Sequence, residues 1–283
     1  MHITALTLFP EFFEAPLRVS IPGRAIDKGR LRVDCVNPRD FATDTHGTVD
    51  DTPYGGGAGM VMRATEVGAA LSHARALDAS VHRPTVLLSP QGAPLTQPVV
   101  EHLAHEEGLI LVCGRYEGID ERFVTQEVDH EISLGDFVLS GGEPAAFVLI
   151  DAISRLLDGV VGNRDSIVWE SFYDGTLEHP HFTRPYDLDG DTVPDILRSG
   201  DHGKVAQWRR KVSLLRTQAR RPDLWEKLSL SAKDRALLAD DRIAVDPRWY
   251  APTRLRGLPS GDSATDAEDQ ASAEPQKDVP PKS

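Results

Sequence analysis

Cysteine is scarce in this chain, with Cys35 and Cys113 as the two thiols among 283 residues. Two cysteines cannot build the usual four-ligand structural zinc site, and no pattern suggests a disulfide framework. The N-terminus has no basic residue before Arg18 and no unbroken apolar segment long enough for a signal peptide or membrane anchor. We therefore expect a cytoplasmic protein with reduced thiols, no membrane association and a core drawn from its 40% of apolar residues.

Positive charge is also in deficit, and the net charge of −13 argues at first against binding to nucleic acid. The distribution of charge changes that expectation. Between Lys204 and Arg221 the chain has seven basic residues and no acidic one. A basic patch of this kind can bind phosphates while the rest of the protein stays acidic.

Several familiar motifs are missing. The glycine-rich stretch "PYGGGAGMVM" (53–62) fits neither a P-loop nor Gly-x-Gly-x-x-Gly, which counts against an NAD-dependent oxidoreductase. No Gly-x-Ser-x-Gly elbow supports acyl hydrolysis. The "HPH" at 179–181 could ligate a metal, but it has no cysteine or patterned carboxylate partner. We expect local hydrogen bonding there and no metal site.

Short apolar runs alternate with helical stretches over residues 1–160, which predicts an α/β domain with a largely parallel sheet. The expected strands are 3–8, 31–36, 85–88, 109–113 and 131–134. After Gly162 the pattern becomes helical, and the segment 204–221 places an apolar stripe on one face: Val205, Trp208, Val212, Leu215 and Ala219. From Ala251 the composition predicts a disordered tail.

Three of the expected strands run into loops of small residues, "SPQG" at 89–92, "GRYEG" at 114–118 and the stretch 133–142. Ligands of open α/β sheets bind outside the carboxyl ends of the strands. Backbone groups of such loops suit a flat, largely neutral group, such as an adenine with its ribose, better than a triphosphate. The three loops together predict a pocket for a nucleoside-like cofactor.

The segments "DDTPYGGGAGMVM", "LSPQG", "GRYEGID", "SLGDFVLSGGE" and "PHFTRP", followed by "GDHGKVAQWRRKVSLLRTQARRPDL", resemble in order and spacing the bacterial tRNA (guanine-N1)-methyltransferase family. This family acts on guanosine 37 of tRNA, next to the anticodon. The resemblance covers roughly residues 1–245 and is far more specific than any single motif.

The resemblance implies a SPOUT fold, an α/β domain with a parallel sheet and a C-terminal trefoil knot, followed by a small all-helical C-terminal domain. The implied divisions are a domain that binds S-adenosylmethionine (1–161), an interdomain loop (162–178), a helical tRNA-binding domain (179–250) and a disordered tail (251–283). The family works as a homodimer whose active sites are shared between subunits.

The same resemblance assigns a cofactor pocket for S-adenosylmethionine. Its residues are Leu88, Ser89, Pro90, Gly114, Tyr116, Glu117, Gly118, Ser133, Leu134, Gly135, Asp136, Phe137, Val138, Leu139, Ser140 and Gly141. No residue is assigned as a metal ligand, and the sequence leaves open whether a divalent metal assists. The residues expected to contact tRNA are Gly59, Ser166, His181, Arg209, Arg216 and Arg220.

Two catalytic residues follow from the resemblance. Arg155 matches an arginine that would stabilise negative charge on guanine O6. Glu170, in "WESF", stands where the family has the aspartate that removes the N1 proton, and its side chain is one methylene longer. Asp165 and Asp174 flank Glu170 and are further, weaker candidate bases. Without the resemblance, Arg155 is better explained as a surface residue that pairs with Asp151 one helical turn earlier.

Two alternatives stay open at this point. One is a SPOUT methyltransferase with another RNA target, which the basic segment 204–221 would select. The other is a non-catalytic RNA-binding or ribosome-associated protein, which would have no affinity for the cofactor.

Overall fold

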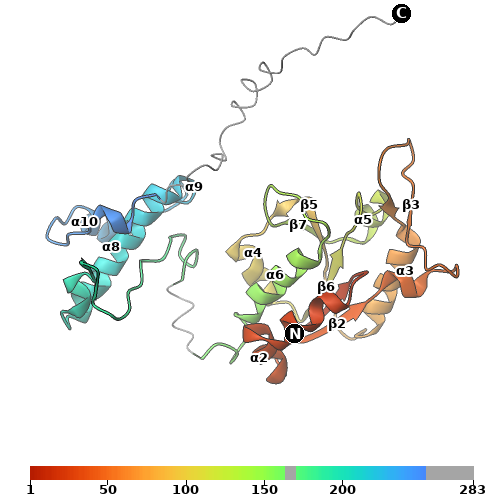
Figure 1. Cartoon of the computed structure of the whole chain (residues 1–283), viewed down its shortest axis with the longest axis horizontal. Coiled ribbons are helices and arrows are strands. Elements are labelled where there is room, and N and C mark those ends of the chain that lie inside the picture. Colours follow the sequence, from red (N-terminus) through yellow and green to blue (C-terminus); the bar gives the residue numbers. More distant parts are fainter. Residues whose placement is uncertain (163–169, 253–283) are drawn as a thin grey trace, which may run out of the picture. The chain divides into compact units, whose positions relative to one another are not determined.

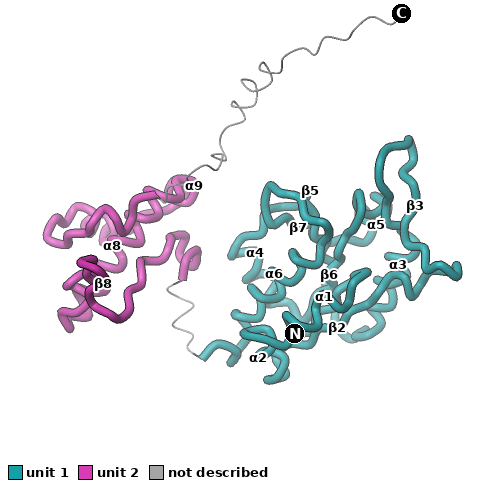
Figure 2. The backbone as a smooth tube through the Cα atoms, viewed as in Figure 1, with its two compact units in different colours: residues 1–167 teal, residues 168–283 magenta. Residues whose placement is uncertain are grey.

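The computed structural model describes residues 1–162 and 170–252, and the chain divides into two compact units, residues 1–167 and 168–283 (Figure 2). Asp165, Ser166 and nearly all of the expected tail lie outside the described residues.

A five-stranded parallel sheet forms the centre of the first unit (Figure 1). Its order is β2-β1-β6-β5-β7. The strands are β1 (His2–Leu6), β2 (Arg32–Val36), β5 (Thr85–Pro94), β6 (Gly108–Cys113) and β7 (His130–Ser133). All five expected strands are present, which confirms the α/β class with a parallel sheet.

Strand β6 explains why the sheet is buried on both faces. Its side chains alternate, so that Leu109 and Leu111 belong to one hydrophobic cluster and Ile110 and Val112 to the other. Helices α1 (Glu11–Glu14), α2 (Ser20–Asp27), α4 (Gln97–Ala104) and α6 (Glu143–Ser154) contribute to the first cluster. Helices α3 (Ala64–Ala76) and α5 (Glu121–Glu127) contribute to the second.

Short elements complete the first unit. The 3-10 turns η1 (Pro16–Arg18) and η2 (Pro38–Phe41) begin with proline, whose fixed φ suits the first turn of a helix. Strands β3 (Asp50–Asp51) and β4 (Val61–Met62) pair antiparallel at the base of the glycine-rich stretch 53–62.

The second unit is built around α8 (His202–Arg220), which begins at the side-chain cap Asp201. Shorter helices α9 (Pro222–Trp225) and α10 (Ala232–Leu238) follow, with the 3-10 turns η3 (Asp195–Arg198) and η4 (Pro247–Trp249). A short hairpin pairs β8 (Asp187–Leu188) with β9 (Asp191–Thr192), two residues in each strand, so the described part is not purely helical.

The apolar stripe of α8 is buried at Trp208 and Val212, as expected, but only partly at Val205, Leu215 and Ala219. Polar side chains share the buried face instead. Ser213 and Thr217 are buried, and both hydroxyls hydrogen-bond to the segment 176–177. The inner face of α8 therefore holds this segment by hydrogen bonds as well as by apolar contact.

Candidate functional site

The three predicted loops follow three neighbouring strands, β6, β5 and β7, and so meet at one edge of the sheet. Strand β5 differs from expectation because it continues to Pro94, and residues 89–92 bulge out of it. Leu88 and Ala93 both pair with Ile132 of β7, so the four residues between them are excluded from the pairing. A side chain at Gly92 would overlap the backbone of Glu131 and Ile132, which explains the glycine.

A buried ion pair joins two of these loops. The Arg115 guanidinium lies 2.8 Å from the Glu143 carboxylate and donates a hydrogen bond to the carbonyl of Ser140, at 3.0 Å. Thr7, just after β1, donates to the other oxygen of Glu143 at 2.8 Å. The Arg115 guanidinium also lies over the ring of Phe9, 4.3 Å from its centre. Together these contacts fix the 114–118 and 133–142 loops relative to the sheet.

Glycine is required beside this ion pair. A side chain at Gly141 would overlap the Arg115 side chain, and one at Gly142 would approach the Cys113 backbone at 2.8 Å. Burial raises the pKa of the Cys113 thiol well above its ordinary value, with Glu143 adding to the shift. The thiol at this edge is therefore a packing group and not a nucleophile.

The glycine-rich stretch 53–62 packs against the 114–118 loop. Glu117 donates its backbone N–H to the carbonyl of Met60 at 3.0 Å, and Met62 donates to Gly118 at 2.9 Å. A side chain at Gly59 would overlap Glu117, and Gly59 has a positive φ of 84°. The structure thus brings the predicted tRNA contact Gly59 next to the predicted cofactor contacts Glu117 and Gly118.

The stretch 133–141 exposes large apolar side chains. Ser133 donates its hydroxyl proton to the carbonyl of Gly135 at 3.2 Å, which closes a tight turn. Beyond it Phe137, Val138 and Leu139 are 54%, 88% and 41% exposed. An exposed apolar cluster on a loop is typical of a surface that binds a ligand or another chain.

Tyr116 adds a half-exposed ring to the same edge. Its φ of 59° lies in the left-handed region that side chains other than glycine rarely adopt. Such backbone strain is typical of functional loops. Two of the predicted pocket residues carry a charge, Glu117 and Asp136, and they come from separate loops.

Arg155 lies directly after α6, at its C-cap, and is half-buried. A positively charged residue at the C-terminal end of a helix interacts favourably with the helix dipole. Helix α6 begins at Glu143 beside the loops, and Arg155 lies at its other end.

The segment 170–178 opens the described part of the second unit. Glu170 is half-buried, and Ser171 accepts a hydrogen bond from the backbone N–H of Glu178 at 2.9 Å. Phe172 donates its N–H to the carbonyl of Thr176 at 2.7 Å. These bonds close the segment into a compact turn whose first residue is the predicted base.

Asp174, one of the further candidate bases, is engaged in ion pairing. Arg210 of α8 bridges its carboxylate and that of Asp234, which is 2.8 Å from the guanidinium. Partial burial opposes ionisation of Asp174, but the hydrogen bond from Thr176 and the charge of Arg210 outweigh it and lower its pKa. Such a carboxylate is a weak base, which favours Glu170 for that role.

The predicted tRNA-binding arginines have different environments. Arg209 is exposed. Arg216 donates to the carbonyls of Glu178 and Trp249, at 3.0 and 2.7 Å, and Arg220 donates to Ala251 at 2.9 Å. Arg216 and Arg220 therefore hold the folded chain of the second unit together. Only the guanidinium N–H groups that do not make these bonds could donate hydrogen bonds to phosphate.

His181 is exposed and lies 2.7 Å from the carboxylate of Glu178. Its neighbour His179 is half-buried, and burial, reinforced by the charge of Arg209, lowers the pKa of its imidazole. The local hydrogen bonding expected at "HPH" is thus present between His181 and Glu178.

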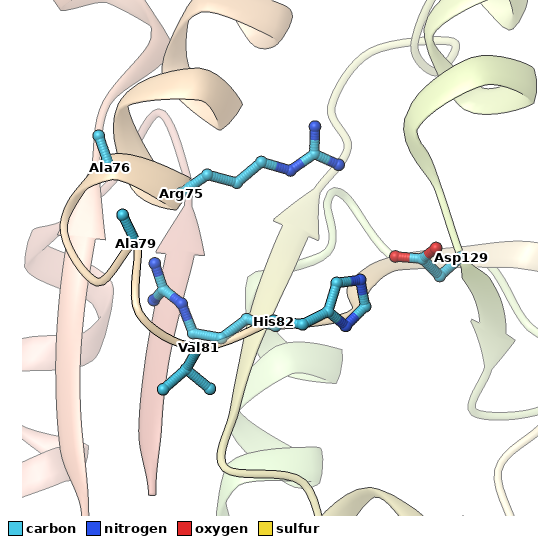
Figure 3. Close-up of a pocket in the computed structure, with 7 residues that line it drawn as sticks. Arg75, Ala76, Ala79, Val81, His82 and Asp129 are labelled. Atoms are coloured by element: carbon cyan, nitrogen blue, oxygen red, sulfur yellow. The ribbon is translucent and has the colours of Figure 1, made fainter.

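A cavity of about 410 Å³ lies at the opposite edge of the sheet (Figure 3). Arg75, His82 and Asp129 line it together with Arg83. Asp129 accepts a hydrogen bond from the N–H of Thr85, the first residue of β5, which places the cavity at the amino ends of the strands. No predicted site residue lines it.

Five supporting residues were not predicted from the sequence. Thr7, Arg115 and Glu143 hold the 114–118 and 133–142 loops. Arg210 and Ser213 hold the segment 174–177 of the second unit. The available signal was the pair of opposite charges directly beside glycines, in "GRYEG" and "SGGEP". Among residues 1–162 and 170–252, no helix has the length and apolar character needed to cross a membrane.

This chain is similar to known proteins over most of its length. A family model described as tRNA (Guanine-1)-methyltransferase TrmD matches residues 1–227. A tRNA (guanine-N(1)-)-methyltransferase of Desulforamulus reducens is 49% identical over 240 residues, 85% of this chain and 94% of that protein. Proteins of the same name from Novosphingobium aromaticivorans and a Synechococcus species are 53% and 50% identical, over 79% and 87% of this chain and 90% and 97% of their own. The chain belongs to the tRNA (guanine-1)-methyltransferase TrmD family.

Proposed function

We propose that this protein transfers a methyl group from S-adenosylmethionine to N1 of guanosine 37 in tRNA, in the cytoplasm. The observation that carries the proposal is the convergence of three glycine-containing loops at one sheet edge, braced by Arg115 and Glu143, in a chain of this family. The exposed basic side chains of α8, such as Arg209, support tRNA as the substrate.

The loops fit S-adenosylmethionine by their donor chemistry. Gly114, Gly118, Gly135 and Gly141 leave backbone groups accessible, which suits an adenine ring held by N–H and C=O groups. The residues that would hold it are the bulge after Leu88, the 114–118 loop and the stretch 133–141. Bound there, S-adenosylmethionine supplies a methyl group activated by its sulfonium.

Two side chains would carry the remaining chemistry. The Glu170 carboxylate would accept the proton from guanine N1, so that the N1 electron pair could form the new bond to the methyl carbon. The carbon–sulfur bond would break at the same time, with its electron pair left on the departing neutral thioether. As the proton leaves, negative charge spreads to O6, and the Arg155 guanidinium stabilises it. Alignment of N1 with the methyl carbon supplies much of the rate, since well-oriented reactants gain roughly 7–11 kcal/mol.

The proposal includes the assembly implied by the family. The stretch 133–141 would form part of a trefoil knot, and residues 162–178 would join the cofactor domain to a tRNA-binding domain over 179–250. The exposed side chains of Phe137, Val138 and Leu139 support a homodimer in which a partner subunit covers this surface. Each active site would then combine the cofactor loops of one subunit with the Glu170 segment of the other.

Labelled S-adenosylmethionine tests the function when it is incubated with two unmodified tRNA transcripts that differ only at position 37. We expect label in the transcript with guanosine 37 and none in the transcript with adenosine 37. Equal labelling of both, or of neither, would contradict the proposal. Calorimetry with S-adenosylmethionine alone separates a non-catalytic RNA-binding protein, which would show no binding.

A further inference from the structure

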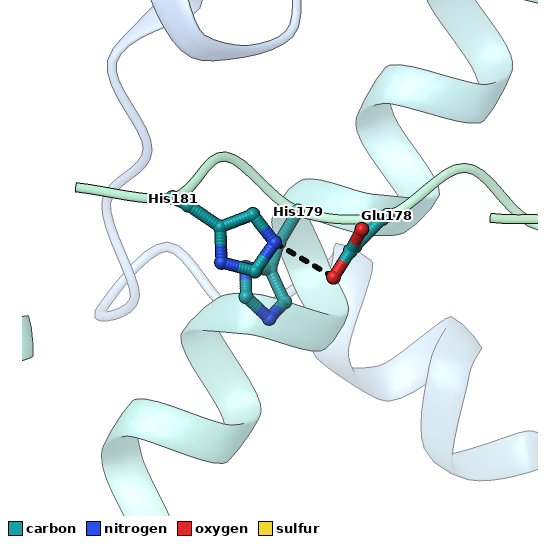
Figure 4. Close-up of side chains that lie close together, drawn as sticks. All are labelled: Glu178, His179 and His181. Carbon is teal, nitrogen blue, oxygen red and sulfur yellow. Dashed lines mark hydrogen bonds and ion pairs between the residues drawn. The ribbon is translucent and has the colours of Figure 1, made fainter. Parts of the chain in front are cut away.

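Three potential metal ligands lie together in the second unit. Glu178, His179 and His181 each offer one ligand atom, and these atoms all lie within 4.8 Å of one another (Figure 4). We propose that they form a binding site for a divalent transition-metal ion of the Zn²⁺ class. No metal was expected here from the sequence, because "HPH" has no cysteine or patterned carboxylate partner, but Glu178 directly precedes it and supplies a carboxylate.

The donor set selects the class of ion. Two imidazole nitrogens and one carboxylate oxygen suit Zn²⁺ and its neighbours, whereas Mg²⁺ prefers oxygen ligands. Three protein ligands also leave one position of a tetrahedral ion open to water or substrate, unlike the four protein ligands of a structural site.

The geometry needs only side-chain rotation to bind the ion. Ligand atoms about 2 Å from a tetrahedral Zn²⁺ stand roughly 3.3 Å apart. In the structure the Glu178 oxygen and the His181 nitrogen are 2.7 Å apart, and no pair of ligand atoms exceeds 4.8 Å. His181 is exposed, so its ring has room to turn.

The backbone that carries these ligands is fixed on both sides. Before the cluster, the Glu178 N–H is bonded to Ser171 and its carbonyl to Arg216. After it, the Phe182 ring packs edge-on against Trp249, with 4.8 Å between ring centres. Ligands preorganised in this way lose little conformational entropy when an ion binds.

Two charged side chains near the cluster have opposite effects on the binding of a cation. Arg209 lies close enough to influence His179, and its positive charge disfavours a cation. The Glu178 carboxylate offsets this charge, and it pairs with the proposed ligand His181. The site lies wholly within the second unit and does not depend on the proposed methyl transfer.

Titration with Co²⁺, a spectroscopic substitute for Zn²⁺, tests the site in the full-length, tag-free and RNA-free protein. We expect one equivalent with the visible absorption of a four- or five-coordinate ion, displaced by Zn²⁺ but not by excess Mg²⁺. His179→Gln and Glu178→Gln should each weaken binding at least about 10-fold, since even outer partners of a metal contribute that much.

His202→Gln is the matched control, because His202 is exposed on α8 and is not a member of the cluster. It should bind Co²⁺ like the wild type. Circular dichroism without metal checks that each variant is folded. If His179→Gln does not fold, Glu178→Gln alone tests the site. The proposal would be overturned if the wild type bound no equivalent of Co²⁺. It would also be overturned if a folded cluster variant bound Co²⁺ at full affinity, or if Mg²⁺ displaced the bound Co²⁺.

Discussion

Glu170 is the residue on which the proposed chemistry depends most. Glu170→Gln keeps the size of the side chain but removes the carboxylate that accepts the N1 proton. We expect methyl transfer to fall by roughly 10²- to 10⁴-fold, the usual contribution of a general base, while the affinity for S-adenosylmethionine stays unchanged. Single-turnover kinetics and calorimetry measure the two quantities.

Glu170→Asp is the matched control, since it restores the carboxylate on the shorter stem used by the family. It should keep far more activity than Glu170→Gln. If Glu170→Gln turned over at a near-normal rate, another base would be required. Asp174 would be a poor substitute, because Arg210 and Thr176 lower its pKa.

Asp234 gives the second unit a predictable dependence on acid. Hydrogen bonds from Arg210 lower its pKa from 3.8 to about 2, although burial opposes this shift. A carboxylate with a lowered pKa stabilises the folded state above its unfolded pKa, and this stabilisation is lost as the pH falls through the folded pKa. The second unit should therefore lose stability between pH 4 and about pH 2.

Tryptophan fluorescence during urea unfolding measures this effect selectively. The four tryptophans, Trp169, Trp208, Trp225 and Trp249, all lie in the second unit. The stability difference between the wild type and Asp234→Asn should be largest above pH 4 and shrink toward pH 2. A difference that does not change with pH would contradict the assigned pKa.

At the scale of elements, the Arg115–Glu143 pair connects β1, the 114–118 loop and the start of α6. Glu143 is fully buried, so Glu143→Gln leaves the Arg115 charge without its partner. Removal of one partner from a buried pair costs about 3–5 kcal/mol. We expect this loss in the unfolding free energy, with weaker binding of S-adenosylmethionine because the loops are no longer braced.

Glu127→Gln provides a control with the same chemical change. Glu127 pairs with Arg75 at 2.7 Å near the protein surface, where ion pairs contribute about 0–1 kcal/mol. Chemical unfolding followed by circular dichroism should show a small effect for this variant. Comparable destabilisation by both variants would mean that Arg115 and Glu143 do not brace the loops as described.

The regular elements could be predicted from sequence because their periodicity is local. The apolar run of β6 and the capped helix α8 needed no knowledge of distant residues. The continuation of β5 to Pro94 could not be predicted, since residues 93 and 94 are held by β7, some forty positions away in the chain. The partner of Arg115 could not be predicted for the same reason, since Glu143 lies at the start of another element, far along the chain.

Mixed dimers test the proposed whole molecule. Gly141→Val should abolish cofactor binding, because its side chain would overlap Arg115. If active sites are shared, a dimer of one Gly141→Val and one Glu170→Gln subunit has one site with both defects and one with neither. Random exchange of the two inactive variants should then restore about a quarter of the wild-type activity.

Each variant alone, taken through the same exchange procedure, is the control and should remain inactive. No recovery in the mixture, with exchange verified by mass spectrometry, would place Glu170 and the cofactor loops of one active site in the same subunit.

Chain threading and assembly lie furthest from what a single sequence can predict. Hydrophobic periodicity describes which faces are buried but not the path of one segment past another, so a knot was expected from family resemblance alone. The arginines of α8 illustrate the same limit. Their charge predicted RNA contact, whereas Arg216 and Arg220 donate hydrogen bonds to carbonyls of their own chain.

The position of the new methyl group is the decisive test of the proposed activity. Nucleoside mass spectrometry of the tRNA product, combined with reverse transcription through the anticodon loop, identifies both the modified atom and the modified residue. We expect 1-methylguanosine with transcription arrest at position 37. Methylation of another guanine atom, of another position, or of no residue would contradict it.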